Sequence, residues 1–234
     1  IRDAEAAIQK KDPSFSIRKL DYDDAATYKM LGQGETEGVF QLESSGMKQV
    51  LVGLQPQNLE DVIALISLYR PGPMDSIPTY LRNRHEPDKI SYKTPQLAHI
   101  LDVTNGCIVY QEQVMQIFRE LAGFSFGQAD NVRRAMSKKK HAVMEAEREH
   151  FVHGCTEPGH ECPGCVANGI SEKVANEIYD EMSSFASYAF NKSHAACYAY
   201  VAFQTAYLKC HYPSEFMAAL LTSCLLYTSD AADE

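Results

Sequence analysis

The stretch LEDVIALISLYRPGP occupies residues 59–73. Its apolar side chains recur at the i, i+3, i+4 and i+7 positions of a helix: Leu59, Val62, Ile63 and Ile66. This spacing predicts a helix with one buried face. The Pro71-Gly72-Pro73 corner must end that helix, because proline cannot continue it and restricts the residue before it. The helix is therefore expected to deliver Arg70 to a sharp turn.

The same spacing predicts helices elsewhere in the chain. Apolar residues show it in two further sets, Val114, Ile117, Phe118 and Leu121, and Val174, Ile178, Met182 and Phe185. Two more helices are expected from about Ser193 to His211 and from Ser214 onward, on either side of Pro213. Strand signals are short and occur only at 39–42 and 107–110. The predicted fold class is mainly α, with short minor β elements.

Size and composition limit the possible classes of protein. The 234 residues are 45% hydrophobic, enough for a real core, and carry a formal net charge of -9. This acidic balance argues against nonspecific adhesion of the whole surface to nucleic acid, so any phosphate contact must be local. The first residues lack both an initiator Met and the apolar core of a signal peptide, and no stretch reaches eighteen apolar residues. We therefore expect a cytoplasmic protein, without membrane contact, that begins within a longer polypeptide.

The segment Gln128–Lys140, QADNVRRAMSKKK, concentrates positive charge in this acidic chain. Its cations are Arg133, Arg134, Lys138, Lys139 and Lys140. On a helix, Arg134 and Lys138 share a face with Arg133 beside them, so guanidinium and ammonium groups could converge on one polyphosphate. The alternative is an ordinary solvated charged face.

The segment Phe185–Tyr198, FASYAFNKSHAACY, crowds several chemistries where one helix should end and the next begin. The residues concerned are Tyr188, Phe190, Asn191, Lys192, Ser193 and His194. Aromatic rings offer stacking faces to a base, while the cations and the free backbone amides of a helix N-terminus suit phosphate. The alternative is that the rings are core residues and Ser193 is a helix cap.

Three further polar residues are weaker candidates. Arg70 lies at the proline corner, and Gln111 and Glu112 lie where a short strand should lead into a helix. They could support a binding site. Alternatively, Arg70 braces a helix end and Glu112 is its structural partner.

Four residues of the insert at 153–165 have metal-ligand chemistry: Cys155, His160, Cys162 and Cys165. Zinc prefers four tetrahedral ligands of this kind, and three cysteines with one histidine form a common structural set. Only one half of the site has a paired CxxC, however. Reduced bystander thiols and a redox pair therefore remain alternatives to Zn²⁺.

Six blocks of the chain resemble a known family in the right order: VFQLESSGMK, ALISLYRPGPM, IVYQEQVMQI, ADNVRRAMSKKK, FASYAFNKSHAACYAYVAFQTAYLK and YPSEFMAALLTS. They are similar to the fingers region of the bacterial DNA polymerase III α subunit, a C-family replicative polymerase. The resemblance extends from about Asp21 to Ser223. It implies template-directed addition of deoxynucleotides to a primer 3′ end, with two Mg²⁺ ions.

The resemblance also implies roles for residues and partners. Arg133 and Arg134, with Lys138–Lys140, would contact the triphosphate, and Tyr188–His194 would line the nascent base pair and sugar. Implied partners are primer-template DNA and dNTPs, the remaining polymerase domains in cis, and the sliding clamp and replisome subunits through those domains. A stand-alone nucleotide or nucleic-acid-binding module, or a zinc-stabilised interaction domain, is the alternative.

The carboxylates that hold the polymerase metals in this family are not found in the sequence. Neither a PDxDxD string nor an FDFLG-like block occurs. The acidic run Asp21–Asp24 better fits a cap and acidic first turn for a helix through Met30. Two-metal chemistry needs such ligands, so no catalytic residue is expected in this chain and it should not polymerise alone.

The last eleven residues, CLLYTSDAADE at 224–234, depart from the family pattern. They look like translated read-through of a sequencing adapter. The domain organisation expected is a partial fingers domain at 1–223 followed by a non-native tail.

Overall fold

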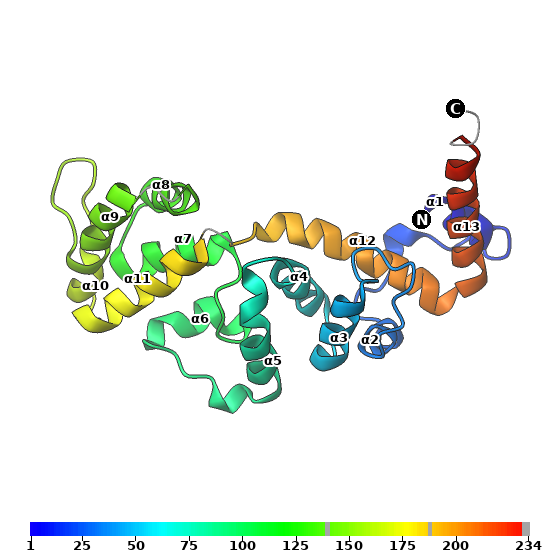
Figure 1. The fold of residues 1–234 in the computed structure, drawn as a ribbon, viewed down its shortest axis with the longest axis horizontal. Coiled ribbons are helices and arrows are strands. Elements are labelled where there is room, and N and C mark those ends of the chain that lie inside the picture. The colour runs from blue at the N-terminus through cyan, green and yellow to red at the C-terminus, as the bar shows by residue number, and fades with distance from the viewer. Residues whose placement is uncertain (139–140, 187–188, 231–234) are drawn as a thin grey trace. The chain divides into compact units, whose positions relative to one another are not determined.

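The computed structural model describes residues 1–138, 141–186 and 189–230. Regular structure in these residues is almost entirely helical (Figure 1), which confirms the predicted fold class. The α-helices are α1 (Arg2–Gln9), α2 (Ala25–Gly32), α3 (Ser45–Leu54), α4 (Leu59–Leu68), α5 (Ile77–His85), α6 (Ala98–Leu101), α7 (Gln111–Ala122), α8 (Phe126–Ser137), α9 (His141–His153), α10 (Gly164–Ala167), α11 (Glu172–Ala186), α12 (Lys192–His211) and α13 (Pro213–Asp230). Short 3-10 helices span Ile17–Lys19, Pro73–Ser76, Pro87–Lys89, Pro95–Leu97 and Asp102–Thr104. None of the described helices is long and apolar enough for a membrane span.

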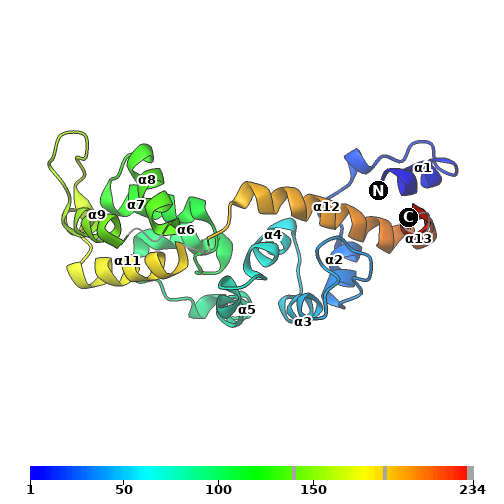
Figure 2. The same ribbon diagram turned by 45° about the horizontal axis from the view of Figure 1, so that its top comes forward.

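The chain divides into two compact units, which we describe separately. The first comprises Ile1–Ile66 and Ala196–Glu234, and the second comprises Ser67–Ala195. In the first unit α2 packs beside α3, and α1 packs on α13 (Figure 2). A small core there buries Ala4, Ile8, Ile17, Leu208 and Phe216.

Helix boundaries follow the local signals in the sequence. Helix α4 ends at Leu68, ahead of the proline corner, and α7 ends at Ala122, before Gly123, whose φ of 74° is accessible to glycine without strain. The carboxylate of Asp24 caps α2 by accepting the amide of Thr27 at 2.8 Å. The predicted cap is therefore confirmed at Asp24, but the predicted acidic first turn is wrong, because α2 begins at Ala25, after the acidic run.

The two predicted strands are wrong. Residues 39–42 form turns, and of 107–110 only Tyr110 makes an isolated bridge, to Phe190. Turn bonds and side chains, rather than partner strands, satisfy these backbones: the Leu42 amide donates to the Val39 carbonyl at 3.1 Å, and the Thr36 hydroxyl donates to the Leu42 carbonyl at 2.6 Å. Similarly, the Gln113 side-chain oxygen accepts the amide of Tyr110 at 3.0 Å. Apolar runs of four residues can thus be buried without joining a sheet.

The second unit is built around α7. Figure 1 shows α8, α9, α10 and α11 gathered about it, and its inward side chains Val114, Ile117, Phe118 and Leu121 are fully buried. The ring of Phe118 contacts three other aromatic rings, those of Phe124, Phe151 and Tyr179, with centroids 5.0–6.0 Å away. Each fully buried ring of this kind contributes about 1.5–3 kcal/mol. This core fixes the orientation of α7 and α8, which carry the candidate site.

Candidate nucleotide-binding site

The N-terminus of α7 is joined to the segment before α12. The amide of Gln111 donates to the Phe190 carbonyl at 2.9 Å, and the Phe190 amide donates to the Val109 carbonyl at 3.2 Å. The Gln111 side chain adds a third bond, from Nε2 to the Ala189 carbonyl at 3.0 Å. The aromatic junction predicted from the sequence is thereby held against the first turn of α7.

A guanidinium on α8 is held by the same glutamine. Arg133 donates from Nη1 to Oε1 of Gln111 at 3.0 Å, and from Nε and Nη2 to Oδ1 of Asp130 at 3.0 and 2.7 Å. Only 20% of the Arg133 side chain is exposed. Because all five N–H donors of a guanidinium lie in one plane, the two partners fix the position of the fork and leave the remaining donors for a ligand.

The neighbouring Arg134 shares the carboxylate but lies in a different environment. Its Nε lies 2.8 Å from Oδ2 of Asp130, and 65% of its side chain is exposed. The hydrogen bond from Arg133, with the charges of both arginines, holds the pKa of Asp130 below its usual value. Asp130 therefore remains ionised, orients both guanidinium groups and neutralises one of their two charges.

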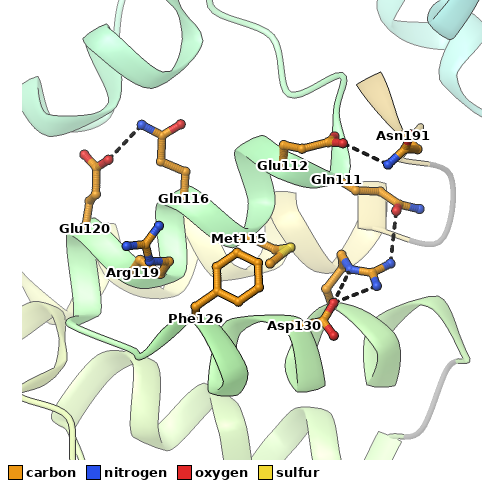
Figure 3. Close-up of a pocket in the computed structure, with 10 residues that line it drawn as sticks. Gln111, Glu112, Met115, Gln116, Arg119, Glu120, Phe126, Asp130 and Asn191 are labelled. Atoms are coloured by element: carbon orange, nitrogen blue, oxygen red, sulfur yellow. Dashed lines mark hydrogen bonds and ion pairs between the residues drawn. The ribbon is translucent and has the colours of Figure 1, made fainter. Parts of the chain in front are cut away.

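A cavity of about 500 Å³ opens between α7 and α8 (Figure 3). Its walls are Gln111, Glu112, Met115, Gln116, Arg119 and Glu120 of α7, Phe126, Asp130 and Arg133 of α8, and Asn191. The volume falls within the range of small-molecule sites, and the mix of apolar, amide and guanidinium groups suits a nucleotide. The ring of Phe126 is 64% exposed, and the Arg119 guanidinium lies 5.9 Å from its centroid.

The start of α12 corrects one prediction. Its backbone amides were expected to be free for phosphate. However, the amide of Lys192 donates to both side-chain oxygens of Glu112, at 3.2 and 3.1 Å, and the amide of His194 donates to the Asn191 side-chain oxygen at 2.9 Å. Asn191 Nδ2 also donates to Glu112, at 2.9 Å. Glu112, which lies 80 residues before Lys192, therefore acts as an anionic cap for α12, with Asn191 as a local cap. A phosphate could reach the Lys192 amide only by displacing Glu112.

Arg70 and His194 both meet the ring of Phe190. The Arg70 guanidinium lies 4.1 Å above the ring centroid, and the His194 ring approaches edge-on with centroids 5.3 Å apart. Burial lowers the pKa of Arg70. The sequence suggested Glu112 as the structural partner of Arg70. In the structure, Glu112 instead contacts the start of α12, and Arg70 stacks on Phe190.

The structure brings some predicted residues together and leaves others apart. Gln111, Glu112, Arg133 and Asn191 line one cavity, and the Lys192 ammonium lies 5.3 Å from the Tyr110 ring centroid. Ser193 follows Lys192 in the first turn of α12, and Lys138 is exposed at the end of α8. Lys139, Lys140 and Tyr188 lie outside the described residues.

Sequence reasoning missed six cavity residues: Met115, Gln116, Arg119, Glu120, Phe126 and Asp130. Asp130 precedes Arg133 and Arg134 by three and four positions, the spacing at which side chains meet on a helix, so this signal could have been found. Arg119 and Phe126 carry no local signal, because their proximity depends on the packing of α7 against α8.

The cysteine insert forms a hairpin rather than a metal centre. Within residues 1–138, 141–186 and 189–230, no three His, Cys, Asp or Glu side chains are grouped to hold a metal. Cys165 is fully buried in the core, where burial raises its thiol pKa to about 12, whereas His160 is exposed in the loop. The described geometry therefore does not support the predicted Zn²⁺ site, because no three of its four residues are grouped as a metal would require.

The hairpin packs its backbone closely against α9, and a prediction follows. A Cβ at Gly164 would lie 2.3 Å from the Gly154 nitrogen, whereas one at Gly159 would meet nothing within 4 Å, and both glycines have positive φ. We expect Gly159→Ala to cost about 1–2 kcal/mol of unfolding free energy from strain alone. Gly164→Ala should cost at least about 2 kcal/mol more, because backbone must move. Urea unfolding of both variants measures the difference, and equal losses would contradict this packing.

Comparison with known proteins identifies the class. The bacterial DNA polymerase III alpha subunit finger domain matches residues 1–159. A DNA polymerase III subunit alpha from Thermus aquaticus is 49% identical over 219 residues, covering 92% of this chain and 17% of the relative. One from Staphylococcus aureus strain N315 is 45% identical over 212 residues, covering 91% of this chain and 19% of the relative.

The chain thus corresponds to less than a fifth of the length of these curated relatives. The finger domain match covers more than half of the residues of this chain. Both relatives are more than 40% identical to this chain over more than 90% of its length. This chain belongs to the bacterial DNA polymerase III alpha subunit finger domain family.

Proposed function

We propose that this chain holds the incoming deoxynucleoside triphosphate for a replicative DNA polymerase that adds dNTPs to a primer 3′ end. The observation that supports this function best is the Gln111–Arg133 hydrogen bond, at 3.0 Å. It joins a guanidinium on α8 to α7 and to the junction before α12, at one nucleotide-sized cavity. Family membership supplies the polymerase context.

The cavity offers what phosphoryl transfer needs from a protein. The transferred and leaving phosphates gain negative charge, and a positioned guanidinium stabilises that charge without reorganising during the reaction. Arg133 supplies the positioned cation, and Arg134 supplies a more exposed one at the rim. Asn191 and the aromatic residues near Phe190 contact the sugar and base, with Arg70, Lys192, Ser193 and His194 around them.

The metal chemistry belongs to other parts of the parent polymerase in this proposal. The sequence has no PDxDxD or FDFLG-like string, and the described residues contain no cluster of potential metal ligands. Mg²⁺ would polarise the phosphates from carboxylates in those parts. This chain alone should therefore bind nucleotide without polymerising. The parent is a cytoplasmic enzyme that engages primer-template DNA, with clamp and replisome contacts in its remaining domains.

Replacement of Arg134 tests the role of the rim cation. In the full-length polymerase, Arg134→Ala should raise KM for the incoming dNTP by about three- to tenfold, because an exposed charge contributes only a modest phosphate contact. Primer-template affinity should not change. Steady-state single-nucleotide incorporation measures the first quantity and fluorescence anisotropy the second. Lys173→Ala, which removes an exposed charge from α11 in the same unit, is the control. Unaltered nucleotide kinetics in the Arg134 variant would refute this assignment.

A further inference from the structure

Two cysteines lie directly opposite each other in the hairpin that follows α9. The Cys155 amide donates to the Cys162 carbonyl at 2.9 Å, and the Cys162 amide donates to the Cys155 carbonyl at the same distance. Residues that exchange both bonds have their Cα atoms about 5.5 Å apart and their side chains on one face. A disulfide needs a Cα separation of about 4.4–6.8 Å, most often 5.5–6 Å. The Cα spacing of this pair is therefore compatible with a disulfide. The Cβ atoms of a hydrogen-bonded pair lie at the wide end of about 4.5–5.5 Å, whereas a disulfide holds them about 3.5–4.5 Å apart, so the two side chains must draw together when the bond forms.

Burial separates Cys155 from the other two thiols. Cys155 is partly buried, whereas Cys162, which is 8% exposed, and Cys165, which is completely buried, both belong to the core. Cys165 also follows Gly164, whose Cα packs against the backbone at Gly154 and leaves no room for movement. An oxidant from solvent can reach Cys155 first. The CxxC spacing of Cys162 and Cys165, which suggests a redox pair in the sequence, is therefore less suitable than the cross-strand pair.

We propose that Cys155 and Cys162 form a reversible disulfide when the chain meets a small-molecule disulfide oxidant. The Cys155 thiolate attacks one sulfur of the oxidant, forming a mixed disulfide and releasing one thiolate. The Cys162 thiolate, its proton lost to solvent, then attacks the Cys155 sulfur and releases the second thiolate. Overall, two protein thiols are oxidised to one disulfide and one oxidant disulfide is reduced to two thiols. The site is independent of the proposed nucleotide-binding function.

The consequence is a covalent clamp on a surface hairpin. The bond would close the loop 156–161 and tie the segment after α9 to the turn before α10, at a position where the backbone is already paired. The fold should remain the same in both redox states. The modification is thus expected to change protection of the hairpin from proteolysis rather than the geometry of the cavity between α7 and α8.

The test treats the 234-residue chain with oxidised glutathione and maps the products by mass spectrometry. A protease that cleaves after Glu161 separates Cys155 from both Cys162 and Cys165. We expect a cross-linked pair of peptides whose mass is that of the two separate peptides minus two hydrogens. Adding reduced glutathione should return the two separate peptides. Cys155→Ser and Cys162→Ser should each abolish the product. Cys197→Ser, which removes an exposed thiol on α12, should leave it intact.

Three results would overturn the proposal. One is a bond between Cys162 and Cys165, which stays within a single peptide. Another is a glutathione adduct that persists on Cys155 without closing. The third is one equivalent of bound zinc whose removal by a chelator is required before these thiols react. If Cys162→Ser does not fold, the peptide pair from the unmodified chain and the Cys155→Ser variant still decide the outcome.

Discussion

Replacing Arg133 by alanine in the full-length polymerase is expected to lower kcat/KM for dNTP incorporation by about 30- to 100-fold. This factor corresponds to about 2–3 kcal/mol, the contribution of a charge-assisted hydrogen bond from a partly buried donor. The fork of Arg133 is already oriented by Gln111 and Asp130, so little ordering is needed when phosphate binds. Pre-steady-state incorporation of a single nucleotide measures the effect.

Two further variants separate charge from geometry. Arg133→Lys keeps the charge but cannot bond Gln111 and Asp130 simultaneously, so it should recover only a small part of the activity. Gln111→Leu removes one support and should weaken nucleotide use by a smaller factor than Arg133→Ala. Lys173→Ala on α11 is again the control. If Arg133→Ala incorporates nucleotide as well as the unaltered enzyme does, the cavity is not the triphosphate site.

Asp130 explains why replacement of Arg133 should weaken nucleotide use more than replacement of Arg134. Its carboxylate binds both arginines, so the cluster of these three residues carries one net positive charge. A triphosphate must therefore compete with Asp130 for the guanidinium groups or use the donors that Asp130 leaves free. Arg133 retains a second partner in Gln111, whereas Arg134 is mostly exposed. This difference explains why the larger loss is expected at Arg133.

The helices could be predicted because their signals are local. The apolar spacing around Val62 and Ile117 and the stops at Pro71 and Gly123 lie within a few residues of the elements they define. The segments at 39–42 and 107–110 were mispredicted as strands because period and composition cannot reveal which group satisfies each amide. In the first segment, the amides of Val39 and Leu42 donate to turn carbonyls. In the second, the amides of Val109 and Tyr110 donate to the Gln113 side chain.

The candidate site was only partly predictable for the same reason. The basic run and the aromatic junction are each contiguous in sequence, so both could be found without knowing the fold. Their connection through Gln111 spans 22 residues to Arg133 and 78 to Ala189, and no local pattern encodes it. The cap that Glu112 provides for α12 is equally remote. Long-range contacts of this kind depend on tertiary packing rather than on propensity.

Gln113 carries the largest stability effect that we expect from a single substitution. It is 4% exposed, and its side-chain oxygen accepts the amides of Val109 and Tyr110 at 2.9 and 3.0 Å. Its Nε2 donates to the Ile100 carbonyl at 3.1 Å and to the Thr104 hydroxyl at 2.7 Å. Gln113→Leu should lower the unfolding free energy by about 3–5 kcal/mol, because it leaves buried amides and a carbonyl without partners. Urea denaturation of the 234-residue chain measures this loss.

Gln116→Leu is the matched control, because it makes the same chemical change one turn later on α7. Gln116 is only partly buried, and its side chain bonds the exposed Glu120 at 2.7 Å. That variant should lose less than about 0.5 kcal/mol. A similarly small loss for Gln113→Leu would mean that water replaces the bonds and that the start of α7 is open to solvent. The cavity rests on this first turn, so a loosened start would also weaken the hold of Gln111 on Arg133. Reduced nucleotide affinity should therefore accompany the loss of stability in the Gln113 variant. Gln116→Leu is the control for stability alone, because Gln116 also lines the cavity.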